Sequence, residues 1–277
     1  MIDLYKWKHF NPKCPTVLTL HNLNAWHTKR LILRKNLLHS LDSYIASRYL
    51  QSILEKITTI NVVNPTLVSA ANEYFPNKNI ISIPFSISIN SPKISVNKKI
   101  RFTVPGTVDR RRRDYETLLD AFEPLYDYYQ TFELVFLGKT YDTFDQPFIT
   151  SFDERVPEKT YNEYLQSSDF IICPIVPETH TINTTTEYYG ITKSPNIFDA
   201  IKYRKPLIVP DSISIPANII SNTLTYSDSL SLFNIINQFF TEPQKMKEIK
   251  EEAISATERF KKEQIRKDLI PWMKKLL

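Results

Sequence analysis

A turn that contains four consecutive arginines is the first place where the residue types point to chemistry. It spans residues 105–113, with Gly106 near its start and Arg110 to Arg113 at its end. Guanidinium groups stay charged and fork onto phosphate oxygens, and a glycine lets the backbone turn tightly. We interpret the turn as a pyrophosphate-binding loop in which one or two of Arg110, Arg112 and Arg113 reach the ligand. The alternative is a solvated basic turn.

A second polar stretch, residues 187–209, is typical of a loop, a helix and a short buried strand. Lys193 closes the loop, and Ser194 or Asn196 can cap the helix, which leaves amide N–H groups facing an anion. Asp199 then falls near the first helical turn, beside the ligand. This stretch predicts a site for phosphate and sugar hydroxyl groups.

Two further positions lie at the ends of predicted strands. Gly138 and Lys139 end the strand predicted over 132–137 and would place a third loop, with Lys139 as a phosphate contact, at the same sheet edge. His21 ends the strand predicted over 16–21. In a cleft it can polarise an acceptor or contact a sugar hydroxyl, and elsewhere it is a hydrogen-bonded structural histidine.

Strands and helices alternate along the chain, which indicates parallel sheets with right-handed crossovers. Other strands are predicted over 60–63, 80–84, 100–104, 170–175 and 207–209, and helices over 28–56, 65–74, 115–129, 158–166, 196–203 and from 227 onward. The predicted organisation is a reduced N-terminal unit over 1–87, a linker over 88–99, a Rossmann-like domain over 100–240 and a helical tail over 241–277.

Length and composition exclude several classes of protein. The 277 residues are 42% hydrophobic and 12% aromatic, as in globular proteins, and contain no run of about 18 apolar residues to span a membrane. Charged residues interrupt the first ten positions, so no secretory signal is predicted and the expected location is cytoplasmic. Two cysteines are too few for a disulfide framework or a thiolate metal site. A net charge of +5 with interspersed acidic residues does not indicate nucleic-acid binding.

The helix predicted over 28–56 is amphipathic and basic in its first turns. Such a helix can lie on anionic lipid, which would make the protein a peripheral membrane protein, but a solvated helix face is the commoner explanation. No HExxH, GxSxG, Walker A or CxxC pattern occurs, so we predict no metal site, no serine hydrolase and no P-loop chemistry.

Several segments together resemble the retaining glycosyltransferases of family 4. The resemblance covers about residues 14–240 and is strongest over 100–210. It is carried by the strand, Gly106 and basic turn, by the segments Leu118–Phe122 and Leu134–Gly138, by residues 161–174, and by Ser194–Ala200 with Lys205–Val209.

The resemblance implies a GT-B fold, in which two Rossmann-like domains with parallel sheets face a nucleotide-sugar, here with a shortened N-terminal domain. Arg113 or Arg112 would match the family's pyrophosphate-binding Lys, and an earlier Arg its companion. Asp199 would match the second acid of the family's spaced glutamate pair, which binds the ribose. Glu187 would match the first, near the transferred sugar. The nucleotide-sugar is the donor substrate, and no separate cofactor is implied.

Two functions remain open at the level of sequence. The first is metal-independent, retaining transfer of a sugar from a nucleotide-diphosphate sugar to a saccharide or lipid-linked acceptor in surface polysaccharide or glycoconjugate synthesis. The second is a non-catalytic nucleotide-sugar or glycan-binding subunit that needs a partner chain to complete its N-terminal domain. An epimerase on the same fold is less favoured, because no clear acid and base set accompanies the donor loop.

Overall fold

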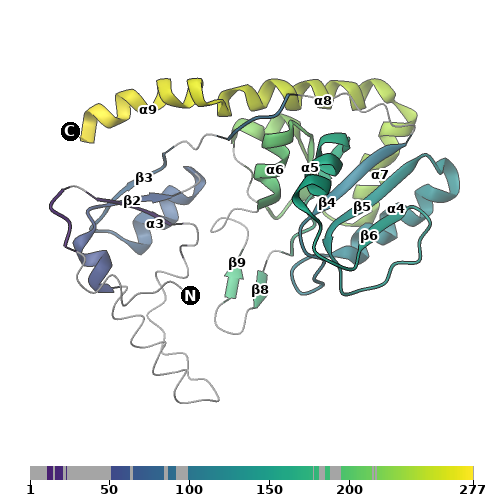
Figure 1. The fold of residues 1–277 in the computed structure, drawn as a ribbon, viewed down its shortest axis with the longest axis horizontal. Coiled ribbons are helices and arrows are strands. Elements are labelled where there is room, and N and C mark those ends of the chain that lie inside the picture. Colours follow the sequence, from purple (N-terminus) through teal and green to yellow (C-terminus); the bar gives the residue numbers. More distant parts are fainter. Residues whose placement is uncertain are drawn as a thin grey trace, which may run out of the picture. The chain divides into compact units, whose positions relative to one another are not determined.

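The computed structural model describes residues 11–14, 16–20, 23, 51–62, 65–83, 87–91, 99–176, 178–180, 185–187, 195–213, 215 and 217–276. The chain divides into two compact units (Figure 1). One comprises Met1–Ile83 and His180–Lys193, and the other Pro84–Thr179 and Ser194–Leu277. The linker predicted over 88–99 and the separate tail over 241–277 stay predictions.

The smaller unit contains a three-stranded parallel sheet. Its strands lie in the order β1 (Val17–Leu20), β2 (Thr59–Val62) and β3 (Asn79–Ile81). The 3-10 turn η2 (Pro65–Leu67) and helix α3 (Val68–Tyr74) connect β2 to β3, as the sequence predicts. Its core contains buried side chains of β1 and β2, of residues 53–57, and of the segment from η2 to Phe75. Of the helix predicted over 28–56, residues 51–56 are described and are helical.

The larger unit contains a six-stranded sheet in the order β11-β10-β7-β4-β5-β6, and all its paired strands are parallel. The strands are β4 (Ile100–Pro105), β5 (Phe132–Lys139), β6 (Ile149–Phe152), β7 (Phe170–Ile172), β10 (Leu207–Pro210) and β11 (Thr223–Tyr226). Numbered within this unit, the order is 3-2-1-4-5-6, the order of the Rossmann fold. The sequence predicts the four central strands and misses the two edge strands, β6 and β11.

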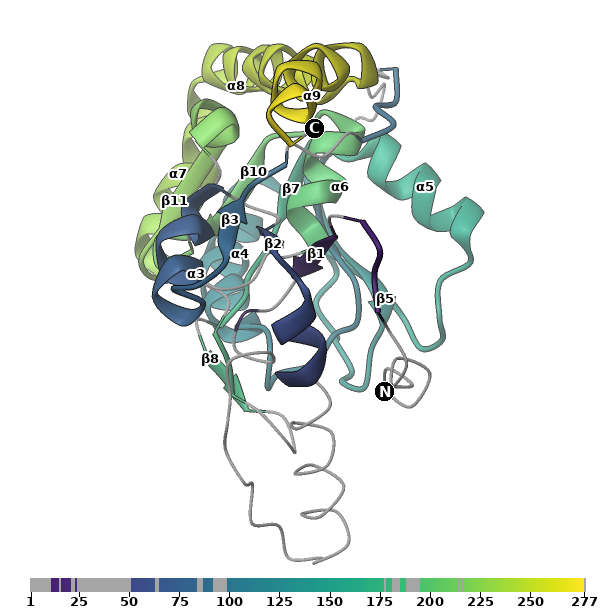
Figure 2. The same cartoon turned by 90° about the vertical axis from the view of Figure 1, so that its left-hand side faces the viewer.

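Helices cover both faces of this sheet (Figure 2). Helices α4 (Tyr115–Tyr129) and α7 (Ser229–Thr241) contact each other on one face, and α5 (Glu158–Ser167) and α6 (Pro195–Tyr203) contact each other on the other. The remaining elements are β8 (Glu178–His180), β9 (Thr185–Glu187), η3 (Ala217–Asn222), α8 (Pro243–Thr257), η4 (Glu258–Phe260) and α9 (Lys262–Leu276). Strands β8 and β9 pair with each other.

Aromatic rings fill the layer between the sheet and helices α4 and α7. The ring of Phe102 lies 5.1 Å from that of Phe122 and 5.2 Å from that of Phe170, centroid to centroid. Because successive side chains of a strand point to opposite faces, the neighbouring Thr103 lies on the other face, where its hydroxyl and that of Ser168 are 2.5 Å apart. Successive residues of β4 therefore pack against different layers on the two faces of the sheet.

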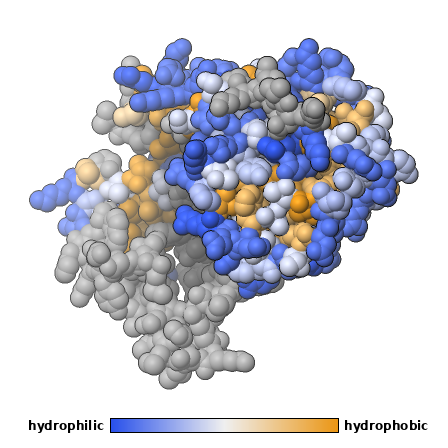
Figure 3. Space-filling model, turned by 45° about the vertical axis from the view of Figure 1, so that its right-hand side comes forward, coloured by the Kyte–Doolittle hydropathy of each residue, from blue (hydrophilic) through white to orange (hydrophobic). Residues whose placement is uncertain are grey.

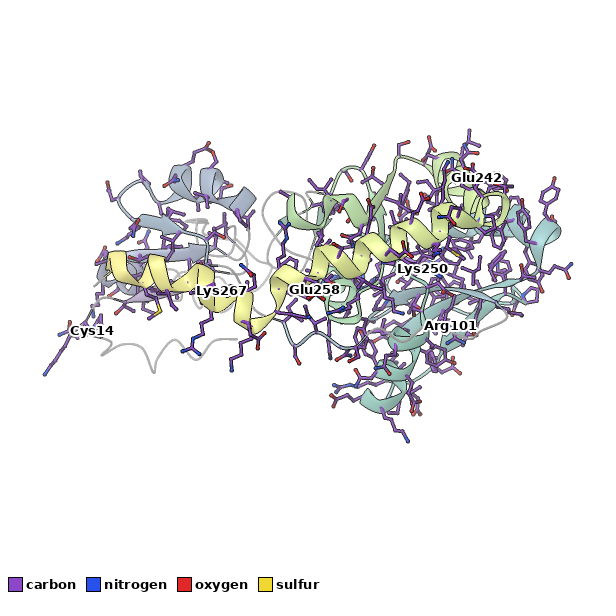
Figure 4. All side chains as sticks on the ribbon, turned by 90° about the horizontal axis from the view of Figure 1, so that it is seen from above. Cys14, Arg101, Glu242, Lys250, Glu258 and Lys267 are labelled. Atoms are coloured by element: carbon purple, nitrogen blue, oxygen red, sulfur yellow. The ribbon has the colours of Figure 1, made fainter. Side chains whose placement is uncertain are left out.

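A group of charged side chains lies at the amino-terminal edge of the same sheet, where Figure 4 labels Arg101 and Lys250. The Asp169 carboxylate accepts hydrogen bonds from the Arg101 amide at 2.8 Å and from Lys250 Nζ of α8 at 2.6 Å. Lys205 Nζ donates to the Gln166 carbonyl at 2.8 Å, and burial lowers the pKa of Lys205 to about 8. The buried charges here are paired or hydrogen-bonded, as burial requires, and they tie α8 to the sheet.

Polar side chains surround smaller apolar patches on the face seen in Figure 3. Within the described part of the chain, no helix has the length and apolar character needed to cross a membrane.

Candidate functional site

The six-stranded sheet has a topological switch point between β4 and β7. Strands β5 and β6 lie on one side of β4, whereas β7, β10 and β11 lie on the other. The chain segments that leave β4 and β7 at their carboxyl ends therefore diverge, and open α/β sheets bind ligands in the crevice that this leaves. The arginine turn follows β4, and the polar stretch that precedes α6 follows β7.

Two glycines, Gly106 and Gly138, lie where the backbones of β4 and β5 meet at this edge. We call their backbone the floor of the site. The amide of Gly106, whose φ is +93°, donates to the Leu137 carbonyl at 2.9 Å. A Cβ on Gly138 would lie 2.2 Å from the carbonyl oxygen of Gly106. The two backbones thus approach each other in a way that only glycine permits at position 138, and a positive φ favours glycine at position 106. The third glycine of the chain, Gly190, lies outside the described residues.

Backbone bonds hold the arginine turn between β5 and β7. Val108 bridges Thr140 beyond β5, and Arg113 bridges Ile175 beyond β7. The Tyr115 hydroxyl accepts from the Asp109 amide at 2.9 Å. Burial raises the pKa of Tyr115 to about 12, so this hydroxyl stays protonated at neutral pH. The turn is therefore fixed by its own polar groups before any ligand arrives.

The four arginine side chains diverge, and Arg113 is the one over the floor. Its Nη2 lies 2.7 Å from the point that a Cβ on Gly106 would occupy, and its Nη1 is buried without a hydrogen-bond partner. Arg110 instead pairs with Glu116 at 3.1 Å and with Asp142 at 3.2 Å. Among the arginines of the turn, Arg113 thus carries a buried donor at the carboxyl edge that a ligand oxygen can satisfy.

The other arginines lie toward solvent. Arg111 binds the Asp109 carboxylate at 2.9 Å, and 83% of its side chain is exposed. Arg112 is exposed as well. Arg113 is therefore the arginine of the turn that is best placed to reach a ligand, and its contact with one stays a prediction.

Of the two caps predicted for α6, Asn196 is not one, and Ser194 lies outside the described residues. The helix begins at Pro195, so Asn196 lies inside it. Its side-chain Nδ2 donates to the Pro105 carbonyl at 2.8 Å, and it is almost fully buried. A proline suits the first helical position because it lacks an amide hydrogen, and this signal was present in the sequence. Asn196 therefore positions the start of α6 against the end of β4.

Asp199 lies one helical turn further along α6 and bonds to a tyrosine of α5. The Tyr161 hydroxyl donates to Asp199 Oδ2 at 2.9 Å. Burial raises the pKa of Asp199 to about 6, although the bond from Tyr161 and the charges of Lys202 and Arg113 oppose this rise. Burial also raises the pKa of Tyr161, so the phenol remains the donor. A half-buried carboxylate with a perturbed pKa beside a cation is typical of functional sites.

The raised pKa of Asp199 leads to a testable dependence of stability on pH. The folded state keeps the proton up to about pH 6, whereas the unfolded chain releases it near the ordinary value of 3.8. Asp199 therefore lowers the stability of the wild-type protein as the pH rises through this window. We expect Asp199→Asn to gain up to about 3 kcal/mol relative to wild type between pH 4 and pH 7.

Urea unfolding of wild type and variant at pH 4, 5, 6 and 7 measures this difference. The exposed Asp153 supplies a matched control, because Asp153→Asn should run parallel to wild type at every pH. Parallel curves for Asp199→Asn would contradict the assignment.

A cavity of about 680 Å³ opens at the ends of β4 and β5. Its lining is Gly106, Thr107, Leu137, Gly138, Lys139, Tyr141, Arg155, Val156, Pro157, Glu158 and Tyr161. The volume falls in the range usual for small-molecule sites. Tyr161 connects the cavity to Asp199, so the two glycines, Lys139 and the α6 carboxylate belong to one edge, as the sequence predicts.

The remaining predicted residues cannot be placed. His21, Lys193 and Ser194 lie outside the described residues, and Glu187 is the last residue of β9 with an undescribed side chain. Conversely, sequence reasoning missed Tyr161, Tyr141, Arg155 and Glu158. An aromatic residue in the first turn of the helix after a predicted strand was the only signal for Tyr161, and the other three carried none.

No protein-family model and no curated protein matches this sequence. Solved structures do match it. The pneumococcal O-GlcNAc transferase GtfA, in complex with UDP and GlcNAc, is similar with a TM-score of 0.59 at 14% identity, over 82% of this chain and 46% of that one. This chain therefore spans about half the length of GtfA.

Two further solved structures are similar over more of this chain. For the sucrose-phosphate synthase from Thermosynechococcus elongatus the TM-score is 0.60 at 14% identity, over 94% of this chain and 67% of that one. For a UDP-forming α,α-trehalose-phosphate synthase from Burkholderia vietnamiensis the TM-score is 0.60 at 8% identity, and the match covers 95% of this chain and 68% of that one.

Together, the topology and these neighbours define the class of fold. The chain has the GT-B type of α/β fold, built from Rossmann-like units with parallel sheets. This confirms the fold class expected from the sequence. At 8–14% identity the similarity concerns the fold, and the chemistry must be argued from the site.

Proposed function

We propose that this protein is a glycosyltransferase that moves a sugar from a nucleotide-diphosphate sugar to a saccharide or glycolipid acceptor, with retention, in the synthesis of cell-surface polysaccharide or glycoconjugate. One observation carries the proposal. Arg113, with its buried unpartnered Nη1, and the half-buried carboxylate of Asp199 lie at the same sheet edge. A nucleotide-sugar needs this combination, because its diphosphate requires donors and its ribose hydroxyls require an acceptor.

In this proposal Arg113 binds the diphosphate, and Arg112 and Lys139 add positive charge at the rim. Negative charge develops on the departing nucleoside diphosphate, and preorganised guanidinium groups stabilise it there without a metal ion. Asp199 accepts hydrogen bonds from the ribose. The role of Glu187 near the transferred sugar rests on the resemblance, whereas those of His21 on the acceptor side and of Lys193 and Ser194 before α6 rest on their places at a strand end and in the loop before the helix. All four remain predictions.

The solved neighbours support the class of donor. GtfA was solved with UDP and GlcNAc, and the trehalose-phosphate synthase is described as UDP-forming. Both therefore handle nucleoside diphosphates on the same fold. The cytoplasmic location and the contact of residues 28–56 with a membrane also remain predictions, since residues 24–50 lie outside the described set.

The purified chain tests this proposal directly. We expect nucleoside diphosphates to raise its thermal stability, because a ligand at about 100 times its Kd adds roughly 2.7 kcal/mol. With the matching nucleotide-sugar, we expect release of nucleoside diphosphate and a product whose anomeric configuration, read by NMR, equals that of the donor. Failure of every nucleoside diphosphate to bind would refute the proposal.

A non-catalytic nucleotide-sugar or glycan-binding subunit is the second candidate. Two observations favour it: the described part of the N-terminal unit holds a sheet of three strands, and the similar structures include the GtfA/B complex. A subunit of this kind would bind the donor but neither transfer nor hydrolyse it until a partner chain is added. Glycosyl transfer by the purified single chain would exclude this candidate.

A further inference from the structure

The cavity beside β5 is lined by three charged side chains. The inference drawn from them rests on the proposed function. Arg155 precedes α5, Glu158 is its first residue, and Lys139 ends β5. All three are exposed and line the same cavity. The cavity thus offers two cationic donors and one carboxylate acceptor around a single space.

Arg155 and Glu158 do not form an ion pair with each other. They are three residues apart and of opposite charge, yet within the described part of the chain neither forms an ion pair or a side-chain hydrogen bond, whereas Arg110, Arg111 and Arg204 all pair with carboxylates. A carboxylate in the first turn of α5 is favoured by the helix dipole without a cation. Both groups therefore remain open to a ligand.

We infer that this cavity binds the base of the nucleotide and prefers guanine. Guanine presents two adjacent donors, N1–H and N2–H₂, and two adjacent acceptors, O6 and N7. A carboxylate can accept from both donors, and an arginine or lysine can donate to both acceptors. Glu158 supplies the first partner, and Arg155 or Lys139 supplies the second.

The other common bases match this set less well. Uracil has a single ring N–H donor, so a carboxylate would gain one hydrogen bond from it. Adenine presents one amino group beside ring acceptors, and it has no N1–H. An unmatched carboxylate in a base pocket also opposes binding, because it must be desolvated without a full set of donors.

An exposed tyrosine at the same cavity provides a surface for stacking. The side chain of Tyr141 is 74% exposed, and Lys139 Nζ lies 5.2 Å from its ring centroid. Aromatic rings stack on every base with little discrimination. Tyr141 would therefore raise the affinity for any nucleotide, whereas Glu158 would determine the specificity for the base.

The test compares GDP, UDP and ADP by calorimetric titration of the full chain. We expect GDP to bind at least about tenfold more tightly than UDP or ADP, the size of one or two charge-assisted hydrogen bonds. Glu158→Gln should remove most of this preference by weakening GDP alone. Tyr141→Ala should weaken all three nucleotides by about tenfold. The exposed Glu154, which does not line the cavity, provides the control variant Glu154→Gln.

The outcomes separate this inference from the proposed function. Tighter binding of GDP that is lost in Glu158→Gln and kept in Glu154→Gln supports it. Binding of UDP or ADP as tight as that of GDP, or a GDP preference unchanged in Glu158→Gln, overturns it while the proposed function stands. Absence of binding by all three nucleotides overturns this inference, and the proposed function is refuted only when every other nucleoside diphosphate fails to bind as well.

Discussion

Replacing Arg113 with alanine is expected to weaken the binding of nucleoside diphosphates about 100-fold, because a hydrogen-bonded charge pair with low exposure to water is lost. The guanidinium lies over Gly106 at the carboxyl end of β4, and its Nη1 has no partner in the protein. A buried donor without a partner costs the folded protein free energy. The unliganded variant should therefore be as stable as wild type, or up to about 1 kcal/mol more stable.

Two measurements separate this result from a general loss of structure. Urea unfolding without ligand reports stability, and isothermal titration with a nucleoside diphosphate reports affinity. The control is Arg111→Ala, because that side chain is 83% exposed and already bound to Asp109. Arg111→Ala should change affinity less than about twofold, as expected for a screened surface charge. Equal losses of affinity in the two variants would show that the turn acts only through its overall charge.

Local signals explain why part of the fold follows from the sequence. Helix α4 has the predicted bounds, Tyr115–Tyr129. Asp114 accepts a hydrogen bond from the Thr117 amide at its start, and Gln130 adopts a left-handed conformation at its end. Buried residues such as Leu118 and Phe122 recur at helical spacing between these points. The signals for the start, the helical period and the end of α4 all lie within 17 residues. Tertiary contacts therefore add little to the prediction of this helix.

The edge strands show where such local signals fail. Strands β6 and β11 each pair with a single neighbour, and most of their residues are half-buried. Their sequences, Ile-Thr-Ser-Phe and Thr-Leu-Thr-Tyr, lack the continuous apolar run of a central strand. Only their pairing with β5 and β10 makes them strands, and that pairing is a tertiary event.

Part of the candidate site can likewise be predicted from local sequence signals, and part of it cannot. The sequence predicts that Gly106, Gly138 and Asp199 share one sheet edge, because loops after parallel strands share an edge. It does not predict that Asp199 accepts a bond from Tyr161, which lies 38 residues away on another helix. Nor does it reveal which arginine of the turn points over the floor. These outcomes depend on strand order and helix orientation, and neither is encoded in a local pattern.

Gly138→Ala is expected to destabilise the fold by about 3 kcal/mol or more, at the upper end of overpacking effects. The added Cβ would lie 2.2 Å from the oxygen and 2.4 Å from the carbon of the Gly106 carbonyl, and 2.9 Å from the Thr107 amide nitrogen. These are backbone atoms, and no rotamer change can move them aside. The strand ends must separate, which breaks the bond from the Gly106 amide to Leu137.

The same separation would displace the floor beneath Arg113, so the fraction of Gly138→Ala that folds should bind nucleoside diphosphates more weakly than wild type. Urea unfolding measures the first effect and titration of the folded variant the second. Lys139→Ala, at the adjacent exposed position, is the stability control and should cost less than about 0.5 kcal/mol. An unchanged urea midpoint for Gly138→Ala would mean that β4 and β5 do not approach as closely in solution. In that case the two glycines could not form a common floor for the diphosphate, and Arg113 would have to bind it from the turn alone.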